Sequence, residues 1–314
     1  MRYGFLGPET TFTHQALLQA LVDAEGRPEL VPFTSVATAT SALVEGDIDA
    51  LMAPIENSVE GGVSGTLDVL AAARRILIIA EQVVPITFVL AARPGTTLAD
   101  VTSVASHTHA QAQVQQWIRA YLPDVAIEPA SSTAAAAQEL AEATPEEAAG
   151  RAAICSPLAA EHFGLDVLEG GIEDTRGAQT RFVLVTRNGR IPARTGSDKS
   201  TLMVQLPHDR AGALLEMLEL FASNGVNLSR IESRPTGDAL GRYSFSLDVE
   251  GHLADRRVAA ALRSLHRLCP VVLYLGSYPR VDGGRPIVTD VHRDDAYDDA
   301  RDWVERLSEM IAED

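Results

Sequence analysis

Residues 172–186 read IEDTRGAQTRFVLVT, and this stretch joins a polar loop to a strand. Its last five residues are almost all β-branched or apolar, which predicts a buried strand. The polar half before them contains Gly177 and suits a loop. Thr180 and Arg181 stand at the junction, where a strand holds side chains rigidly and an arginine fork can grip a carboxylate. The stretch predicts a site for a small dianionic substrate. Taken alone, an ordinary loop–strand junction with a surface arginine explains it equally well.

The composition describes a globular protein of more than one domain. A chain of 314 residues predicts two or three domains, and 46% hydrophobic with 22% charged residues is ordinary for a soluble protein. The net charge of −17 argues against nonspecific binding to nucleic acid or to anionic membranes. Residues 290–314 hold ten Asp and Glu against three Arg, so this segment alone contributes −7.

The sequence predicts a cytoplasmic protein. No apolar run approaches the roughly 20 residues that a membrane span requires. The N-terminus enters a strand at Tyr3 without the apolar segment of a secretory signal. Cys155 and Cys269 both lie in apolar runs, which predicts buried free thiols rather than a disulfide or metal ligands.

Residues 1–187 predict a first domain of two α/β lobes. Short apolar runs alternate with helical periods, a pattern typical of mostly parallel sheets covered by helices. We expect lobe one at about 1–78 and 160–187, and lobe two at about 79–159. Such lobes enclose a cleft in which ligands bind at the carboxyl ends of the strands.

A different pattern follows the linker 187–198. Residues 199–277 show the order β-α-β-β-α-β, which predicts a ferredoxin-like domain. The acidic tail 278–314 contains one predicted amphipathic helix over 294–311, and its apolar residues on one side are Trp303, Leu307 and Ile311. A weakly docked, solvated helix is the favoured interpretation.

Five polar turns in the first domain carry hydroxyl and amide side chains, most of them after predicted strands. They span residues 7–13, 54–58, 106–113, 131–133 and the Thr180 stretch. His107 and His109 are interpreted as polar residues of a first helical turn, because side chains two apart on a helix diverge. No phosphate-binding glycine loop or nucleophile elbow is present. These turns predict a small-anion site with no metal and no cofactor.

The same turns, in the same order, resemble the prephenate dehydratase family over about residues 1–280. The matching motifs are Gly7-Pro8 with Thr11-Phe12, PIENS at 54–58 with GGV at 61–63 and TLD at 66–68, Ser106-His107 with Ala110 and Gln113, and Thr180-Arg181-Phe182. The resemblance implies a periplasmic-binding-protein-like catalytic domain followed by an ACT regulatory domain. In that second domain, Gly212–Leu215 and Glu232–Pro235 look like the family's phenylalanine-binding motifs.

The chain departs from the family pattern at three places. Thr10 stands where glycine is usual, Thr108 where proline is frequent, and Gly177-Ala178 where asparagines are common. No role of an asparagine at the last position carries over to this chain.

The resemblance implies a carbon–oxygen lyase that converts prephenate to phenylpyruvate, with loss of carbon dioxide and the ring hydroxyl. The implied catalytic residues are Thr11, Glu56, Asn57, Ser58, Ser106, Gln113, Thr180, Arg181 and Phe182. Thr180 is expected to act on the leaving hydroxyl, and Arg181 to clamp a carboxylate or to orient the loop. Asn57, Ser106 and Gln113 are expected to complete the hydrogen bonding, with Glu56 orienting them.

The resemblance also implies inhibition by phenylalanine in a homodimer or homotetramer. The implied regulatory residues are Gly212, Ala213, Leu214, Leu215, Glu232, Ser233, Arg234 and Pro235. Two alternatives remain: a dehydratase that prefers arogenate, and a non-catalytic intracellular amino-acid sensor.

Overall fold

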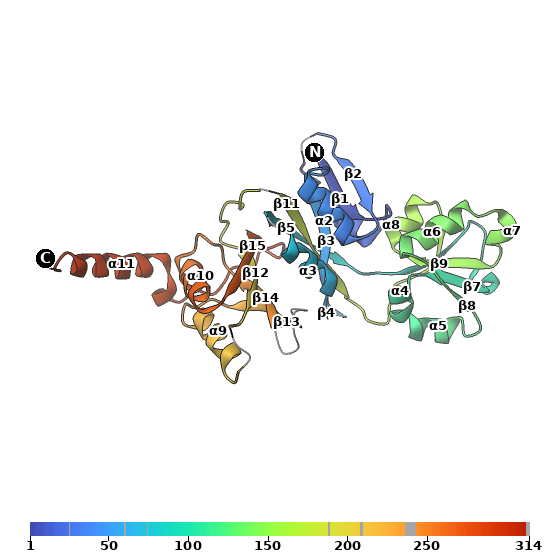
Figure 1. The fold of residues 1–314 in the computed structure, drawn as a ribbon. Coiled ribbons are helices and arrows are strands. Elements are labelled where there is room, and N and C mark those ends of the chain that lie inside the picture. Colours follow the sequence, from blue (N-terminus) through green and yellow to red (C-terminus); the bar gives the residue numbers. More distant parts are fainter. Residues whose placement is uncertain are drawn as a thin grey trace. The chain divides into compact units, whose positions relative to one another are not determined.

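The computed structural model describes residues 1–24, 26–59, 61–73, 75–187, 189–207, 210–235 and 243–311 (Figure 1). The chain forms two compact units. The first combines Met1–Ala73 with Gln82–Arg187, and the second combines Arg74–Glu81 with Asn188–Asp314.

Lobe one of the first unit is a mixed sheet in the order β2-β1-β3-β11-β5. Its strands are β1 (Arg2–Leu6), β2 (Glu29–Phe33), β3 (Ala50–Asn57), the short β4 (Gly61–Gly62), β5 (Ile76–Pro85) and β11 (Gln179–Arg187). Its helices are α1 (Phe12–Ala20), α2 (Val36–Glu45) and α3 (Ser64–Ala72). β1 runs parallel to β2 and β3, whereas β11 is antiparallel to β3. β11 is buried along most of its length, which explains why its sequence is almost continuously apolar.

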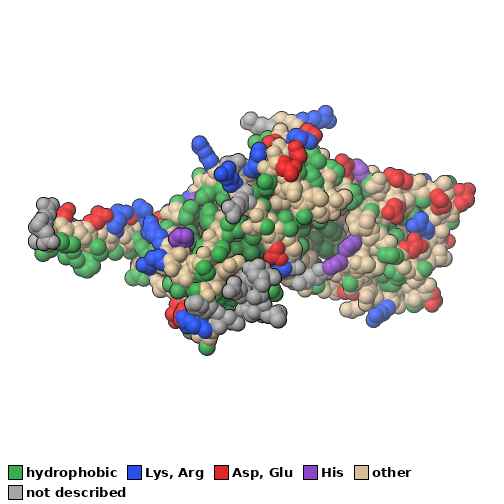
Figure 2. All heavy atoms as spheres, in the orientation of Figure 1, with side chains coloured by type: hydrophobic (Ala, Val, Ile, Leu, Met, Phe, Trp, Pro, Cys, Tyr) green, Lys and Arg blue, Asp and Glu red, His purple; other side chains and the backbone are tan. Residues whose placement is uncertain are grey.

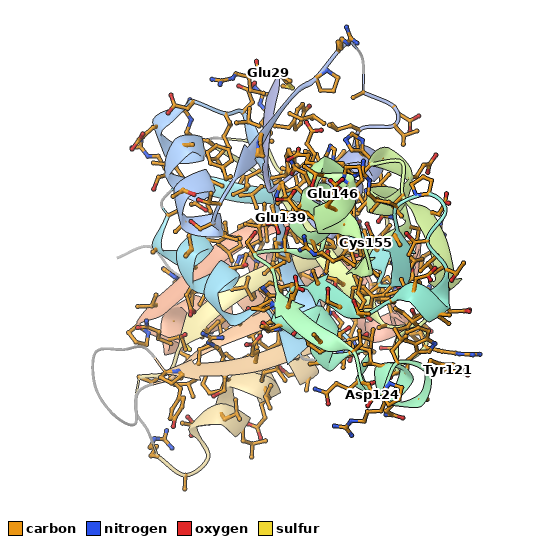
Figure 3. The ribbon with its side chains drawn as sticks, turned by 90° about the vertical axis from the view of Figure 1, so that its right-hand side faces the viewer. Glu29, Tyr121, Asp124, Glu139, Glu146 and Cys155 are labelled. Atoms are coloured by element: carbon orange, nitrogen blue, oxygen red, sulfur yellow. The ribbon has the colours of Figure 1, made fainter. Side chains whose placement is uncertain are left out.

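Lobe two is a second mixed sheet, in the order β10-β6-β9-β7-β8. Its strands are β6 (Val89–Ala92), β7 (Ser103–Ser106), β8 (Ala126–Pro129), β9 (Arg151–Cys155) and β10 (Asp166–Gly170). The helices of this lobe are α4 (Thr108–Ala112), α5 (Gln115–Tyr121), α6 (Thr133–Glu142), α7 (Pro145–Ala148) and α8 (Pro157–His162), with a 3₁₀ turn at Leu98–Asp100. Figure 3 shows Cys155 inside this lobe, where it is fully buried, and Tyr121 and Asp124 at its margin.

Two segments cross between the lobes, one at residues 86–88 and one at 172–178. They contact each other where the Ile86 amide donates to the Ala178 carbonyl at 2.8 Å. Both crossings come later in the chain than the boundaries predicted near 79 and 160. The outgoing strand β5 continues to Pro85, and β10 still belongs to lobe two because it pairs with β6.

The second unit contains an antiparallel sheet in the order β13-β14-β12-β15. Its strands are β12 (Asp198–Gln205), β13 (Leu228–Pro235), β14 (Tyr243–Glu250) and β15 (Val271–Pro279), and its helices are α9 (Ala213–Ala222) and α10 (Arg256–Leu268). Met217, Phe221 and Leu265 fill the core between helices and sheet. The predicted α/β fold class, with two lobes and a separate βαββαβ domain, is confirmed.

The first half of β5 belongs to this second unit. The Lys199 ammonium lies 2.9 Å from the Glu81 carboxylate, and both side chains are buried. Gly276 adopts φ 142°, and a Cβ at this position would lie 2.3 Å from the Ile78 carbonyl oxygen. Only glycine permits this approach of the β15 backbone to β5.

The tail forms a 3₁₀ turn (Asp290–His292) and helix α11 (Asp294–Ser308). The helix begins at the predicted residue and ends before the predicted 311. Asp294 anchors it by accepting from the Arg256 amide at 2.9 Å. Among the described residues, no helix is long and apolar enough to span a membrane.

Candidate active site

A cavity of about 350 Å³ lies within the first unit. Its polar lining consists of hydroxyls, amides and two histidines, and its apolar lining includes phenylalanines from both lobes. The lining residues are Leu6, Gly7, Thr11, Phe12, Thr13, Thr34, Pro54, Asn57, Ile86, Phe88, His107, His109, Ala110, Gln113, Ser131, Ser132, Thr133, Thr180 and Phe182. None of these lining residues is Asp, Glu, Lys or Arg. The cavity has the size of a small-ligand site and contains no fixed carboxylate or arginine charge.

Strand ends and helix starts supply most of this lining. The cavity lies where the parallel strands β1, β2, β7 and β8 end, which is the expected ligand position in such sheets. Thr11 and Ser132 cap helices α1 and α6 by accepting backbone N–H groups. The first turns of two helices therefore face the cavity, and the free N–H groups and positive dipole end of such turns favour anions.

Thr180 and Asn57 form the polar contact at the base of the cavity. They lie opposite each other in the β11–β3 ladder, and the Asn57 Nδ2 donates to the Thr180 Oγ1 at 2.9 Å. The register shifts after Arg181, so that Phe182 pairs with Pro54 and β3 carries one extra residue. This bulge allows Pro54 and Asn57, three residues apart, to line the same cavity.

Arg181 does not line the cavity. As the neighbour of Thr180 on a strand, it points to the opposite face of the sheet. Its Nη1 donates to the Glu56 carboxylate at 3.0 Å, and the arginine side chain is only 10% exposed. Of the two roles predicted for Arg181, this geometry favours orientation of the strand pair over direct contact with a substrate.

The other predicted catalytic residues divide into two groups. Thr11, Gln113 and Phe182 line the cavity. Ser106 does not: its buried hydroxyl donates to the Ile154 carbonyl at 2.7 Å. Ser58 also lies outside the lining, and its Oγ accepts from the Gln179 amide at 2.9 Å. These two serines hold the turns that present the lining residues.

Several lining residues are absent from the predicted catalytic residues. His107 caps α4, and its ring stacks on that of His109 with centroids 5.2 Å apart. The rule that side chains two apart diverge does not apply, because His107 precedes the helix. Phe88 packs edge-to-face on Phe12, with centroids 5.8 Å apart. Nothing local in the sequence identifies Phe88, which reaches the cavity only through the crossing segment.

The loop before α1 contains a strained residue beside the cavity. Thr10 adopts φ 66°, a left-handed conformation that costs a β-branched residue more than it costs glycine. Its amide donates to the His14 Nδ1 at 2.9 Å. Burial lowers the pKa of the His14 imidazole, against a raising effect of Glu9. A glycine, usual here in the family, would adopt this turn without strain.

At the Gly177-Ala178 departure, no polar side chain reaches the cavity. Gly177 adopts φ 78°, and Ala178 is buried in the lobe-two core. In lobe two, burial raises the pKa of the Cys155 thiol to about 12, so this thiol is protonated at neutral pH. In the described part of the chain, no three His, Cys, Asp or Glu residues gather closely enough to hold a metal ion.

The predicted regulatory motifs lie in the second unit. Gly212 precedes α9 with φ 87°, and Leu215 of the first helical turn is 59% exposed. Glu232 lies between Arg230 and Arg234 and pairs with both, at 3.1 and 3.3 Å. Its strand, β13, is at the edge of the sheet.

Comparison with known proteins identifies the family. Residues 3–190 match the family model for prephenate dehydratase, and residues 200–267 match the ACT domain. The chain belongs to the prephenate dehydratase family. A prephenate dehydratase of Mycolicibacterium vanbaalenii is 42% identical, and the match covers 97% of each protein.

Two solved structures have folds similar to that of this chain. The prephenate dehydratase of Arthrobacter aurescens in complex with L-Phe is 48% identical, with a TM-score of 0.89, and the match covers 98% of this chain and all of that one. A structure titled as GqqA, a novel type of quorum quenching acylase, is 28% identical with a TM-score of 0.77, over 89% of this chain and 98% of that one. Because one of these similar structures is named as a dehydratase and the other as an acylase, the fold alone does not identify the reaction.

Proposed function

We propose that this protein converts prephenate to phenylpyruvate, and that the Thr180–Asn57 contact within an otherwise uncharged cavity carries the reaction. The carbon–oxygen bond to the ring hydroxyl breaks, and the hydroxyl leaves with a proton as water. The bond to the ring carboxylate also breaks, carbon dioxide leaves, and the electron pair of that bond completes the aromatic ring. Since aromatisation drives the reaction, the protein has to bind, orient and polarise.

Thr180 is the donor to the leaving hydroxyl. Because its oxygen accepts the Asn57 amide at 2.9 Å, its own proton remains available for the cavity. The amide also polarises the threonine hydroxyl, which is otherwise a very poor acid. The helix starts at Thr11 and Ser132 supply N–H groups for the two substrate carboxylates, with Gln113, His107 and His109 at the rim.

The decisive assay follows phenylpyruvate formation from prephenate by the purified protein, with and without millimolar phenylalanine. Turnover supports the proposal. Absence of turnover by the folded protein contradicts it, and arogenate is then assayed as the alternative substrate. Binding of phenylalanine without turnover of either substrate indicates the sensor alternative.

Phenylalanine is the proposed inhibitor, supported by the L-Phe complex of the Arthrobacter relative. The ligand site is proposed at an interface between ACT domains of a homodimer or homotetramer. Leu215 and Ile231 are exposed apolar residues of the two regulatory motif regions, as such an interface requires. Gly212 would let ligand approach the backbone before α9.

Gly212→Trp is expected to abolish inhibition and to leave basal turnover unchanged. Because φ at Gly212 is 87°, any side chain adds strain as well as bulk. Gly212→Ala is therefore the matched control, since it adds the strain without filling the site. Equal loss of inhibition in both variants would assign the effect to backbone strain, and retained inhibition in Gly212→Trp would place the ligand elsewhere.

Strand β5 is the proposed route of coupling. Its first half is held to the ACT sheet by the Glu81–Lys199 pair, and the chain then leads within a few residues to Ile86 and Phe88 of the cavity. Phenylalanine would have to favour one position of this strand over another. The double variant Lys199→Met/Glu81→Gln, which leaves no unpaired charge, should raise the half-inhibitory phenylalanine concentration. An unchanged value would exclude this route.

A further inference from the structure

The second half of α11 exposes a continuous apolar stripe. Trp303, Val304 and Leu307 are 56, 52 and 44% exposed, and Met310 and Ile311 continue the stripe beyond the helix end. The spacing of Trp303, Val304 and Leu307 places these three side chains on one face of the helix. Figure 2 shows hydrophobic side chains along one edge of this helix and charged ones along the other. Isolated exposed apolar residues are common, but a continuous stripe of this kind marks a contact surface.

The rest of α11 is fixed, so the stripe has a defined position. Asp294 pairs with Arg194 at 2.6 Å, and Asp298 pairs with Arg256 at 3.0 Å. The Tyr297 hydroxyl donates to the Asn224 side chain at 2.8 Å. Beyond Asp298, the hydrogen bonds and ion pairs of the described helix stay within α11. Its first turns are docked and its second half has nothing to cover it in the described chain.

Helix α10 presents a complementary surface. Arg263, His266 and Arg267 are exposed on a helix that has no acidic residue between 256 and 268. Within the described residues, none of the three has a carboxylate partner. A shallow depression runs over Ala260, where the small side chain leaves room, between the arginine stems. It is a basic strip with an apolar floor in a chain of net charge −17.

The two surfaces match in charge. At the helical rise, the part of the stripe within α11, from Trp303 to Leu307, spans about 6 Å, and the depression from Ala260 to Arg267 about 10 Å. Asp302 and Glu309 flank the stripe on one side. Because α11 is held at the first turn of its own α10, a straight α11 does not reach the second half of that helix.

We propose that the distal half of α11 packs on the α10 strip of a second copy of this chain, reciprocally about a twofold axis. Trp303 and Leu307 would lie over Ala260, with Asp302 and Glu309 beside Arg263 and Arg267. A twofold arrangement makes the same contact twice, so two modest patches together form one interface. This contact differs from the ACT pairing proposed above and does not depend on the enzymatic activity.

Site-directed cross-linking tests the contact directly. A Leu307→Cys copy is mixed with an Ala260→Cys copy that carries a tag of different size, under mild oxidation. A covalent heterodimer that requires both cysteines is expected; the native Cys155 and Cys269 are buried. Ile287→Cys, at a position in the tail that is 94% exposed and outside α11, replaces Leu307→Cys as the control and should not cross-link. Absence of the heterodimer would overturn the proposal. So would a Leu307→Cys/Ala260→Cys double variant that forms the cross-link only within one chain.

Charge reversal gives an independent test by sedimentation equilibrium. Arg263→Glu/Arg267→Glu and Asp302→Arg/Glu309→Arg should each weaken self-association at least tenfold. Mixing the two variants should restore it, because each tail then meets an α10 strip of opposite charge in both contacts. Equal association of wild type and both variants, or no recovery on mixing, would contradict the proposed pairing.

Discussion

One cavity in each unit can be compared, and the linings of these two cavities differ in charge. The cavity of the first unit is lined without Asp, Glu, Lys or Arg. The cavity of the second unit, about 230 Å³, is lined by Arg194, Arg257, Arg285 and Arg293 together with Asp198, Asp255 and Asp294. Most of those charges are already paired: Arg194 lies within 2.6 Å of both Asp255 and Asp294. Asp198 accepts the amides of Thr195 and Gly196.

The difference separates structural charge from a binding site. A charge that is already paired inside the protein offers little to a ligand, and removal of its partner would destabilise the fold. A cavity lined by hydroxyls, amides and helix starts, without Asp, Glu, Lys or Arg, presents polar groups and helix dipoles to a charged ligand. The arginine-rich cavity therefore joins the linker, α10 and the tail, and the uncharged one is the proposed site for a dianion.

Lys199→Met is expected to have the largest effect, on the stability of the second unit. It removes the ammonium beside the buried Glu81 carboxylate, and loss of one partner of a buried ion pair typically costs about 3–5 kcal/mol. The double variant Lys199→Met/Glu81→Gln should recover most of this loss. Urea unfolding measures the change, and hydrogen exchange in β12 and β15 locates it. A single variant as stable as wild type would show that this buried pair does not stabilise the unit.

Thr180→Ala is expected to lower turnover on the order of a hundredfold or more with the fold intact. Loss of one preorganised donor typically raises a barrier by about 2.7–4 kcal/mol. Thr186→Ala is the matched control, because Thr186 is on the same strand and donates to the Asp49 carbonyl instead. Turnover of Thr180→Ala within a few-fold of wild type would exclude the proposed role.

Arg181→Met should lower kcat about tenfold, which corresponds to ~1.4 kcal/mol, and leave KM nearly unchanged. The reason is that Arg181 pairs with Glu56 beside the Thr180–Asn57 contact and does not line the cavity. Glu56→Gln should have a similar effect, and the double variant should be little worse than either. A large rise in KM for Arg181→Met alone would instead indicate that the guanidinium clamps a substrate carboxylate.

How much of this site could be predicted depends on whether the signal is local. The alternation from Leu202 to Leu206 and the turn motifs at Asn57 and Thr180 are local, and the sequence predicts them. The bulge that turns Asn57 and Pro54 to one cavity arises from the pairing of β3 with β11, more than a hundred residues apart. No periodicity within either segment reveals it.

The helical region after β7 illustrates the same limit. The sequence predicts that both His107 and His109 belong to a first helical turn, whereas the structure has two short helices here, α4 and α5, and only His109 lies within α4. His107 lies outside the first of them as its cap, so its ring can stack on His109 at the rim of the cavity. Cap geometry depends on where a helix starts, and that boundary is the least predictable part of a helix.

The smallest predicted effect concerns pH and the buried imidazole of His14. Burial lowers its pKa in the folded protein below the unfolded value of 6.5, and the ring stacks on Phe5 at 4.7 Å. The unfolded chain therefore binds this proton more readily. The contribution of neutral His14 to stability is fully present above pH 6.5 and is lost as the pH falls below it. The loss is at most about 1.4 kcal/mol per pH unit for one proton.

Thermal unfolding of wild type and His14→Gln between pH 7.5 and 5.0 measures this effect. Glutamine retains an acceptor for the Thr10 amide but does not titrate, so the melting temperature of the variant should fall less steeply on acidification. Trp117 fluorescence in a Trp303→Phe background reports on the first unit alone, since these are the two tryptophans of the chain. Parallel curves would mean that His14 takes up its proton over the same pH range in the folded and the unfolded protein. In that case burial of the imidazole would contribute nothing to the pH dependence of stability.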